Sequence, residues 1–230
     1  MADPENHLIE ILPRKDRLRL LAACEPVELV YADILCEPAQ VTRHVYFPVD
    51  GFISLLTPTV GRAMLEAGLV GREGMLGIQL VLGVDSVPLH AVVQGPGKAW
   101  RIRNRAFRGE LEQSSALRRG LQRYAYVVMM QLAASAACAR FHQIGPRLAR
   151  RLLMSHDRAH ADRFRVTHEF LAHMLGVRRV GVTRAAGMLQ GARLIEYRRG
   201  VLTVLDRAGL EAAACGCYRT ARQGYAEQFA

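Results

Sequence analysis

The first half of the chain alternates short apolar runs with turn residues. Between residues 26 and 102, runs such as VELVYADILC, HVYFPVDGFISLL and LHAVVQG recur at a spacing of roughly ten residues. The Asp50-Gly51 pair is one of the turn signals that separate them. This pattern is typical of many short antiparallel strands. It predicts a cupin-like jelly roll, or β-roll, preceded by a helical segment over residues 8–23.

A helical repeat replaces this pattern after residue 103. Residues 104–142 contain no proline and two glycines, so we expect one long helix over residues 104–143, about 55 Å in length. One row of positions alternates steps of four and three residues, the spacing of a two-stranded seam, and predicts a homodimer interface. The alternative, a helix lying on its own roll, leaves much of this length uncovered. The row consists of Leu117, Leu121, Tyr124, Val128, Gln131, Ser135 and Cys138.

Two short helices separated by a glycine are predicted in the last third of the chain. Thr167 is suited to cap the first helix, and Gly176 supplies the left-handed turn before a second helix over about residues 178–190. The second helix has apolar residues at the i, i+3, i+4, i+7 spacing of a buried face. These residues are Val182, Ala185, Ala186 and Leu189. The opposite face then carries arginines, as expected of a helix-turn-helix whose second helix enters a major groove.

The stretch RLIEYRRGVLTVLD follows these helices and predicts a two-stranded wing. Arg198 and Arg199 lie at its tip, where they could reach DNA phosphates. The Gly145-Pro146 pair ends the predicted long helix before this region. We therefore expect an α+β protein with a β-roll over residues 1–103, the dimerisation helix over residues 104–143 and a winged helix-turn-helix domain over residues 144–230.

The net charge of +10 over 230 residues is concentrated in the last part of the chain. Residues 1–142 have a net charge of +2, whereas residues 143–230 hold 15 arginines against 7 acids, a net charge of +8. Such a basic domain attracts phosphate polyanions, so double-stranded DNA is the first partner to test. The sequence has no apolar stretch long enough to span a membrane and no basic start typical of a secretion signal, so we expect a cytoplasmic protein.

These motifs resemble those of the Crp/Fnr family of bacterial transcription regulators, above all VTHEFLAHMLGVRRVGVTRA and the wing. The resemblance implies a homodimer that binds a palindromic DNA site, under the control of an event in the roll. RNA polymerase is a further candidate partner. Base-reading roles fall on Arg179, Val180, Thr183 and Arg184, and phosphate contacts on Thr167, His168, Arg178, Arg198 and Arg199. Val180 replaces a glutamate common in the family, which shifts the expected half-site, for instance toward a thymine methyl.

The resemblance also places the effector pocket, which is degenerate here. Cyclic-nucleotide-binding members have a Gly-Glu pair and an Arg-Ser or Arg-Thr pair where this chain has Gly74-Met75 and Leu89-His90; Tyr124 completes the candidate pocket. Without the arginine, the cyclic phosphate loses its charge-assisted contact. We therefore expect no tight binding of cyclic AMP or cyclic GMP, and a roll that senses another signal or none.

No cofactor or metal is predicted. An iron–sulfur cluster of the oxygen-sensing branch needs four cysteines, most of them near the N-terminus, and Cys24 and Cys36 are too few. Haem stays open, with His44, His90 or a cysteine as an axial ligand, and so does redox sensing. Cys215 and Cys217 are interpreted as small packing residues, with a redox or metal element as the alternative.

An enzyme is the rival class of function, because small β-rolls also hold metal-dependent catalytic sites. Such cupin-like metalloenzymes need several converging histidines and a carboxylate. The predicted roll has only His44 and His90, which lie far apart in sequence. We therefore expect a non-enzymatic protein.

Overall fold

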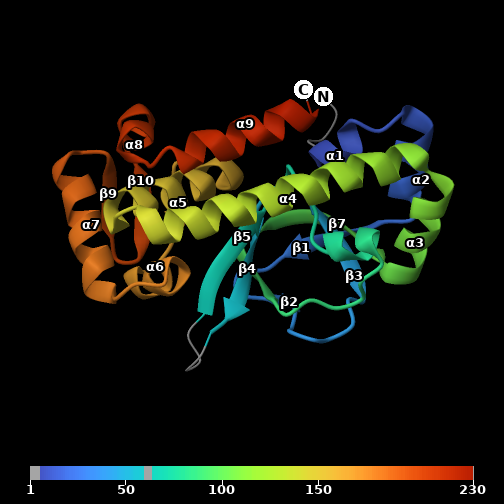
Figure 1. The fold of residues 1–230 in the computed structure, drawn as a ribbon, viewed down its shortest axis with the longest axis horizontal. Coiled ribbons are helices and arrows are strands. Elements are labelled where there is room, and N and C mark those ends of the chain that lie inside the picture. Colours follow the sequence, from blue (N-terminus) through green and yellow to red (C-terminus); the bar gives the residue numbers. More distant parts are fainter. Residues whose placement is uncertain (1–5, 60–63, 230) are drawn as a thin grey trace. The chain divides into compact units, whose positions relative to one another are not determined.

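The computed structural model describes residues 6–59 and 64–229 and contains two compact units (Figure 1). The first unit comprises the described residues up to Leu55 together with Leu69–Met129. The second comprises the described residues of Leu56–Gly68 and those from Met130 onward. The boundary lies within the long helix, between Met129 and Met130.

Short antiparallel strands form the roll, as the sequence predicts. A three-stranded sheet has the order β1-β7-β3 and a four-stranded sheet the order β2-β6-β4-β5, and the β1-β7, β3-β7 and β2-β6 pairs are antiparallel. Buried residues from both sheets, among them Leu29, Ile53, Val70 and Val93, form one core. The elements are α1 (His7–Glu10), α2 (Arg14–Ala22), β1 (Glu25–Leu29), β2 (Ile34–Cys36), β3 (His44–Pro48), β4 (Phe52–Pro58), β5 (Met64–Val70), the 3-10 helix η2 (Ile78–Leu82), β6 (His90–Gly95) and β7 (Gly97–Arg103).

The prediction of one unbroken helix after residue 103 was wrong. The chain forms α3 (Asn104–Gln113) and α4 (Ser115–Phe141), separated by Ser114 in an extended conformation. The backbone N–H of Leu117 donates a hydrogen bond to Ser114 Oγ at 3.0 Å, so Ser114 caps the start of α4. At 27 residues, α4 is about 40 Å long rather than 55 Å.

The predicted dimer seam also requires correction. Leu117, Leu121 and Tyr124 are at most 2% exposed within the single chain, so they belong to its own core and leave no surface for a second chain. The exposed apolar face of α4 lies two positions further along, where Tyr126, Met129 and Met130 are each about half exposed. The heptad spacing in the sequence fits either row, and packing against the chain's own residues selects the inner one.

The second unit contains the predicted winged helix-turn-helix fold. Its small sheet has the order β8-β10-β9, and one buried cluster joins α5, α6, α7 and the wing, with Leu152, Leu171, Val182 and Leu202 near its centre. The elements are α5 (Ile144–Ala159), β8 (Arg163–Arg165), α6 (His168–Leu175), α7 (Arg179–Gly191), β9 (Ile195–Arg198), β10 (Val201–Val204), α8 (Arg207–Ala213) and α9 (Cys217–Phe229).

A buried ion pair lies within the second unit. Arg151 on α5 donates from Nη2 to Glu66 Oε2 on β5 at 2.8 Å, and the two side chains are 6% and 7% exposed. Because both charges are removed from water, each depends on the other for compensation.

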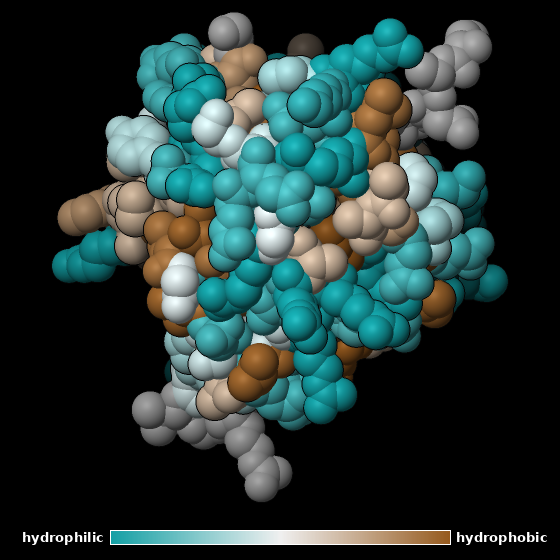
Figure 2. Space-filling model, turned by 90° about the vertical axis from the view of Figure 1, so that its right-hand side faces the viewer, coloured by the Kyte–Doolittle hydropathy of each residue, from teal (hydrophilic) through white to brown (hydrophobic). Residues whose placement is uncertain are grey.

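On the face of the first unit that carries α2 and α3, the visible hydrophobic side chains form no extended patch (Figure 2). Figure 2 shows this face largely covered by hydrophilic side chains, with hydrophobic ones in small separate areas. Across residues 6–59 and 64–229, none of the helices combines the length and the apolar character that a membrane span requires.

Candidate nucleic-acid interface

Local sequence signals determine the helix-turn-helix. The side chain of Thr167 accepts a hydrogen bond from the backbone N–H of Phe170 at 3.0 Å and so caps α6. Gly176 ends α6 in the left-handed conformation, with φ of 61°. Arg178 then precedes α7 without a side-chain cap, and its carbonyl accepts a hydrogen bond from the backbone N–H of Gly181 at 2.9 Å.

The two faces of α7 are divided as the sequence predicts. Val182, Ala185, Ala186 and Leu189 are buried. The opposite face exposes Arg179, Val180, Thr183 and Arg184 to solvent, and Val180 is 64% exposed. Most of the Val180 side chain therefore lies outside the packed core.

The wing is a tight hairpin between β9 and β10. Arg199 and Gly200 at its tip both have positive φ, 49° and 78°, the conformation of a two-residue type I′ turn. Arg198 and Arg199 are exposed. Tyr197 fixes the base of the wing, since its hydroxyl donates to the Val166 carbonyl and its backbone N–H donates to Gln190 Oε1, both at 2.9 Å.

His168 occupies a different environment from that of a free phosphate-binding side chain. Its ring stacks on Tyr197, with centroids 4.3 Å apart, and its Nδ1 lies 3.1 Å from Thr183 Oγ1. Burial, reinforced by the positive charge of Arg179, lowers the pKa of His168. The neutral ring therefore connects the start of α6, the recognition helix α7 and the wing.

Thr183 uses its hydroxyl within the protein. The hydroxyl donates to the carbonyl of Arg179 at 3.1 Å, one turn earlier in α7. Since its single proton is engaged there, the contact with His168 has the imidazole Nδ1–H as donor. Thr183 is left with its methyl group as the part best suited to contact a base.

Charge is strongly one-sided around these elements. Residues 163–200 hold eight arginines against two glutamates, a net charge of +6. In addition to the five arginines predicted to bind DNA, Arg163 and Arg165 on β8 are exposed. The sequence reasoning missed these two, although their alternation in RFR is the pattern of an edge strand with one face in solvent.

Tyr124 lies directly against Gly74 of the candidate effector pocket. A Cβ atom added to Gly74 would overlap the Tyr124 hydroxyl, so the phenol of α4 occupies the space beside this turn. Met75 is buried and 1% exposed, whereas Leu89 and His90 are half-buried at the start of β6. The structure thus brings Gly74 and Tyr124 together within the first unit.

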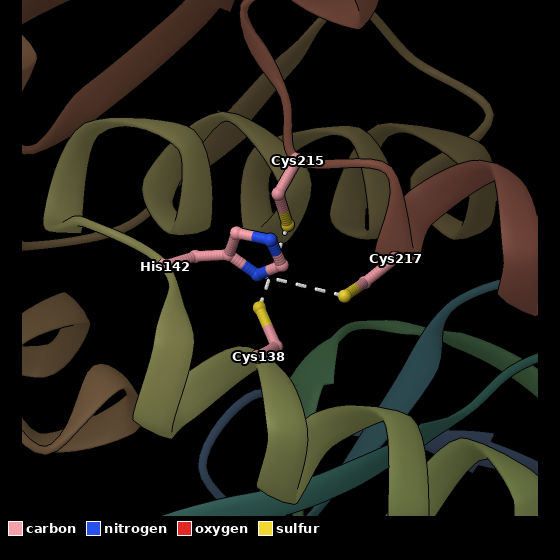
Figure 3. A group of neighbouring side chains, drawn as sticks. All are labelled: Cys138, His142, Cys215 and Cys217. Carbon is pink, nitrogen blue, oxygen red and sulfur yellow. Dashed lines mark hydrogen bonds between the residues drawn. The ribbon is translucent and has the colours of Figure 1, made fainter.

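A cluster of thiol and imidazole side chains in the second unit was not predicted from the sequence. Cys138, placed in the dimer seam by its spacing, and His142 lie beside Cys215 and Cys217 in the second unit, with all four side chains directed toward one another (Figure 3). The interpretation of the cysteine pair as packing residues overlooked this arrangement. Burial raises the pKa of the Cys215 thiol to about 12.

Comparison with known proteins agrees with this architecture. Residues 146–213 match the family of Crp-like helix-turn-helix domains. FixK2 from Bradyrhizobium japonicum has a similar structure, with a TM-score of 0.70, 13% identity, and coverage of 84% of this chain and 98% of that one. A transcriptional regulator of the CRP family from Thermus thermophilus gives a TM-score of 0.68 at 18% identity, covering 82% and 96%.

The c-di-GMP responsive regulator CLP of Xanthomonas campestris is a third structural relative, with a TM-score of 0.62, 17% identity, and coverage of 84% and 99%. None of the curated proteins matches the chain. Likeness at these identities establishes the fold, which is that of proteins with a β-roll and a winged helix-turn-helix. Within this fold, residues 146–213 form a Crp-like helix-turn-helix domain.

Proposed function

We propose that the protein is a homodimeric, sequence-specific DNA-binding regulator of transcription. The observation that carries the proposal is the outer face of α7, where Arg179 and Arg184 are exposed beside the basic wing and above a fully formed helix-turn-helix core. The net charge of +6 over residues 163–200 supplies the long-range attraction to phosphates.

Base recognition falls to four side chains of α7. Arg179 and Arg184 offer bidentate donors to guanine O6 and N7, the most common specific contact of this kind. Val180 and the methyl of Thr183 offer apolar contacts to thymine methyl groups. Thr167, Arg178, Arg198 and Arg199 flank this face and contact phosphates, while His168 holds the wing against α7.

The dimer contact is assigned to the exposed face of α4. Tyr126, Met130, Ala133 and Ala137 alternate steps of four and three residues along it and are exposed. Among the predicted seam residues, Ser135 accepts a hydrogen bond from Arg150 Nη2 at 3.2 Å, and Gln131 and Val128 are half-buried. A second copy of the chain would cover Met129 and Met130, which are otherwise exposed to water as an apolar stripe.

Cyclic nucleotides are not the signal in this proposal. Tyr124 fills the space beside Gly74, and neither of the two predicted binding pairs supplies an arginine. Calorimetric titration with cyclic AMP and cyclic GMP should therefore show no binding. Micromolar affinity for either nucleotide would contradict this part of the proposal.

Salt-dependent DNA binding tests the function itself. The purified protein is titrated into a fluorescent random-sequence duplex at increasing salt, and we expect the logarithm of the affinity to fall linearly with the logarithm of the salt concentration. Arg199→Ala should weaken this binding, whereas Arg14→Ala, which removes an exposed arginine of α2, should leave it unchanged. Salt-independent binding, or equal losses in both variants, would refute the proposed interface.

A further inference from the structure

Four side chains with metal-binding chemistry meet in the second unit. Cys138 and His142 are four residues apart at the end of α4, so they project from the same side of the chain. Cys215 lies in the segment between α8 and α9, and Cys217 is the first residue of α9. Figure 3 shows the imidazole ring among the three sulfur atoms.

The distances between these side chains suit a single ion. One potential ligand atom from each residue lies within 4.8 Å of the other three. Cys138 Sγ lies 3.4 Å from Cys215 Sγ, and Cys217 Sγ lies 3.7 Å from His142 Nδ1. Around a tetrahedral ion with bonds of about 2.3 Å to sulfur, two thiolates are separated by about 3.8 Å. A polynuclear iron–sulfur centre would hold its ligands farther apart, because several irons lie between them.

The donor set also selects the ion. Three thiols and one imidazole, without a carboxylate in the cluster, form a soft set that suits Zn²⁺ and discriminates against Mg²⁺ and Ca²⁺. All four tetrahedral positions are taken by protein atoms, which is the arrangement of a structural site rather than a catalytic one.

A buried positive charge lies near the cluster. Zinc bound by three thiolates and a neutral imidazole has a net charge of −1, which is costly to bury without a counter-charge. Arg150 on α5 is 8% exposed, and its Nε has no hydrogen-bond partner among the described residues. Arg150 lines the same hollow as Cys138, and its Nη2 donates to Ser135 Oγ, one turn before Cys138, at 3.2 Å. Arg150 is thus placed to balance a thiolate-rich centre.

We propose that Cys138, His142, Cys215 and Cys217 bind one zinc ion per chain. The ion would connect the end of α4 to the start of α9, beside the N-terminal turn of α5. The backbone N–H of Cys215 already donates to the Pro146 carbonyl at 3.3 Å in this turn. Bound zinc therefore fixes the junction between α4 and α5, which leads from the long helix into the DNA-binding domain. The site stands independently of the proposed DNA contacts.

Metal analysis of the full-length protein tests this site directly. Protein purified under reducing conditions without oxygen is loaded with Zn²⁺ and dialysed, and we expect one zinc per chain. Replacement by Co²⁺ should give sulfur-to-cobalt charge-transfer absorption and the intense visible bands of tetrahedral coordination. Zinc-free protein after loading, or the weak visible bands of six-coordinate cobalt, would overturn the proposal.

Matched variants identify the ligands. Cys217→Ser and His142→Gln remove two of the four ligands and should weaken zinc binding at least about 100-fold in competition with a chelator. Cys36→Ser, a control half-buried in the first unit, should keep full affinity. Circular dichroism establishes that each variant is folded. Unchanged affinity in both ligand variants would refute the assignment, as would iron with acid-labile sulfide, or a Cys138–Cys215 disulfide in the anaerobic protein.

Discussion

The contact of His168 with the recognition helix and the wing makes a quantitative prediction. His168→Ala removes the hydrogen bond from Nδ1 to Thr183 Oγ1 and the stacking on Tyr197. The substitution changes no arginine, so the variant keeps every arginine of the interface. What changes is the position of the wing relative to α7 before DNA arrives.

The magnitude follows from these two interactions. One hydrogen bond contributes about 0.5–1.5 kcal/mol, and a stacked ring pair contributes about the same. The buried Nε2 of His168 has no hydrogen-bond partner among the described residues, which offsets part of this gain. A loss of about 1–2 kcal/mol corresponds to an affinity about 5- to 30-fold weaker.

Fluorescence anisotropy with one labelled duplex measures this loss. His173→Ala is the matched control, because His173 lies on the same helix α6 and is exposed. We expect the control to bind as the wild type does, and His168→Ala to bind more weakly to specific and random DNA alike. Equal affinities for the two variants would refute the positioning role of His168.

The same residue predicts a pH dependence of stability. Burial lowers the pKa of His168 in the folded protein, so the unfolded chain takes up the proton first as the pH falls through about 6.5. The contribution of the neutral ring is complete above that pH and is lost as the pH falls toward the folded-state pKa. Urea unfolding at pH of about 7.5 and 5.5 should show a larger loss of stability in the wild type than in His168→Ala. An identical loss in both would contradict this reasoning.

Three further perturbations separate the roles assigned to other residues. Arg184→Ala should reduce the free energy of binding to specific DNA by about 1–3 kcal/mol and relax selectivity at one base pair. Arg198→Ala should weaken binding to all sequences alike and reduce the salt slope of the affinity by about one. Equal effects of the two variants on specific and random duplexes would contradict this division of roles. Glu66→Ala leaves Arg151 buried without its carboxylate partner, so the free energy of unfolding should fall by about 3–5 kcal/mol in a urea titration. A loss below about 1 kcal/mol would show that water solvates the pair. Met130→Glu places like charges at the proposed dimer contact and should produce monomers in sedimentation velocity, while a dimer of unchanged stability would exclude this face of α4.

The DNA-binding half was predictable because its signals are local. The cap at Thr167, the turn at Gly176 and the apolar spacing of α7 each depend on residues within a few positions of one another. The break at Ser114 is also local, and the Ser-Ser pair in EQSSAL is a capping signal that outweighs the helix-forming residues around it. Caps and apolar periodicity, which depend on neighbouring residues, are the signals that locate these helix ends and faces in the sequence.

The remaining features depend on residues distant in sequence. Which row of α4 faces inward is decided by packing against the rest of its chain, so Leu117 and Leu121 cannot be told from Met130 by spacing alone. Cys138 and Cys215 are 77 positions apart, and no spacing rule connects them. The sequence displays only the two halves of the cluster, Cys-x3-His and Cys-x-Cys, each too short to indicate a metal site without the fold.

Selection of bound duplexes from a random pool by the purified protein tests the central claim most directly. The account predicts a palindromic motif with guanines in each half-site and half-sites about one helical turn apart, the spacing that a two-fold symmetric dimer requires. A single asymmetric half-site would contradict the dimer, and a pool without an enriched motif would contradict sequence-specific recognition by α7.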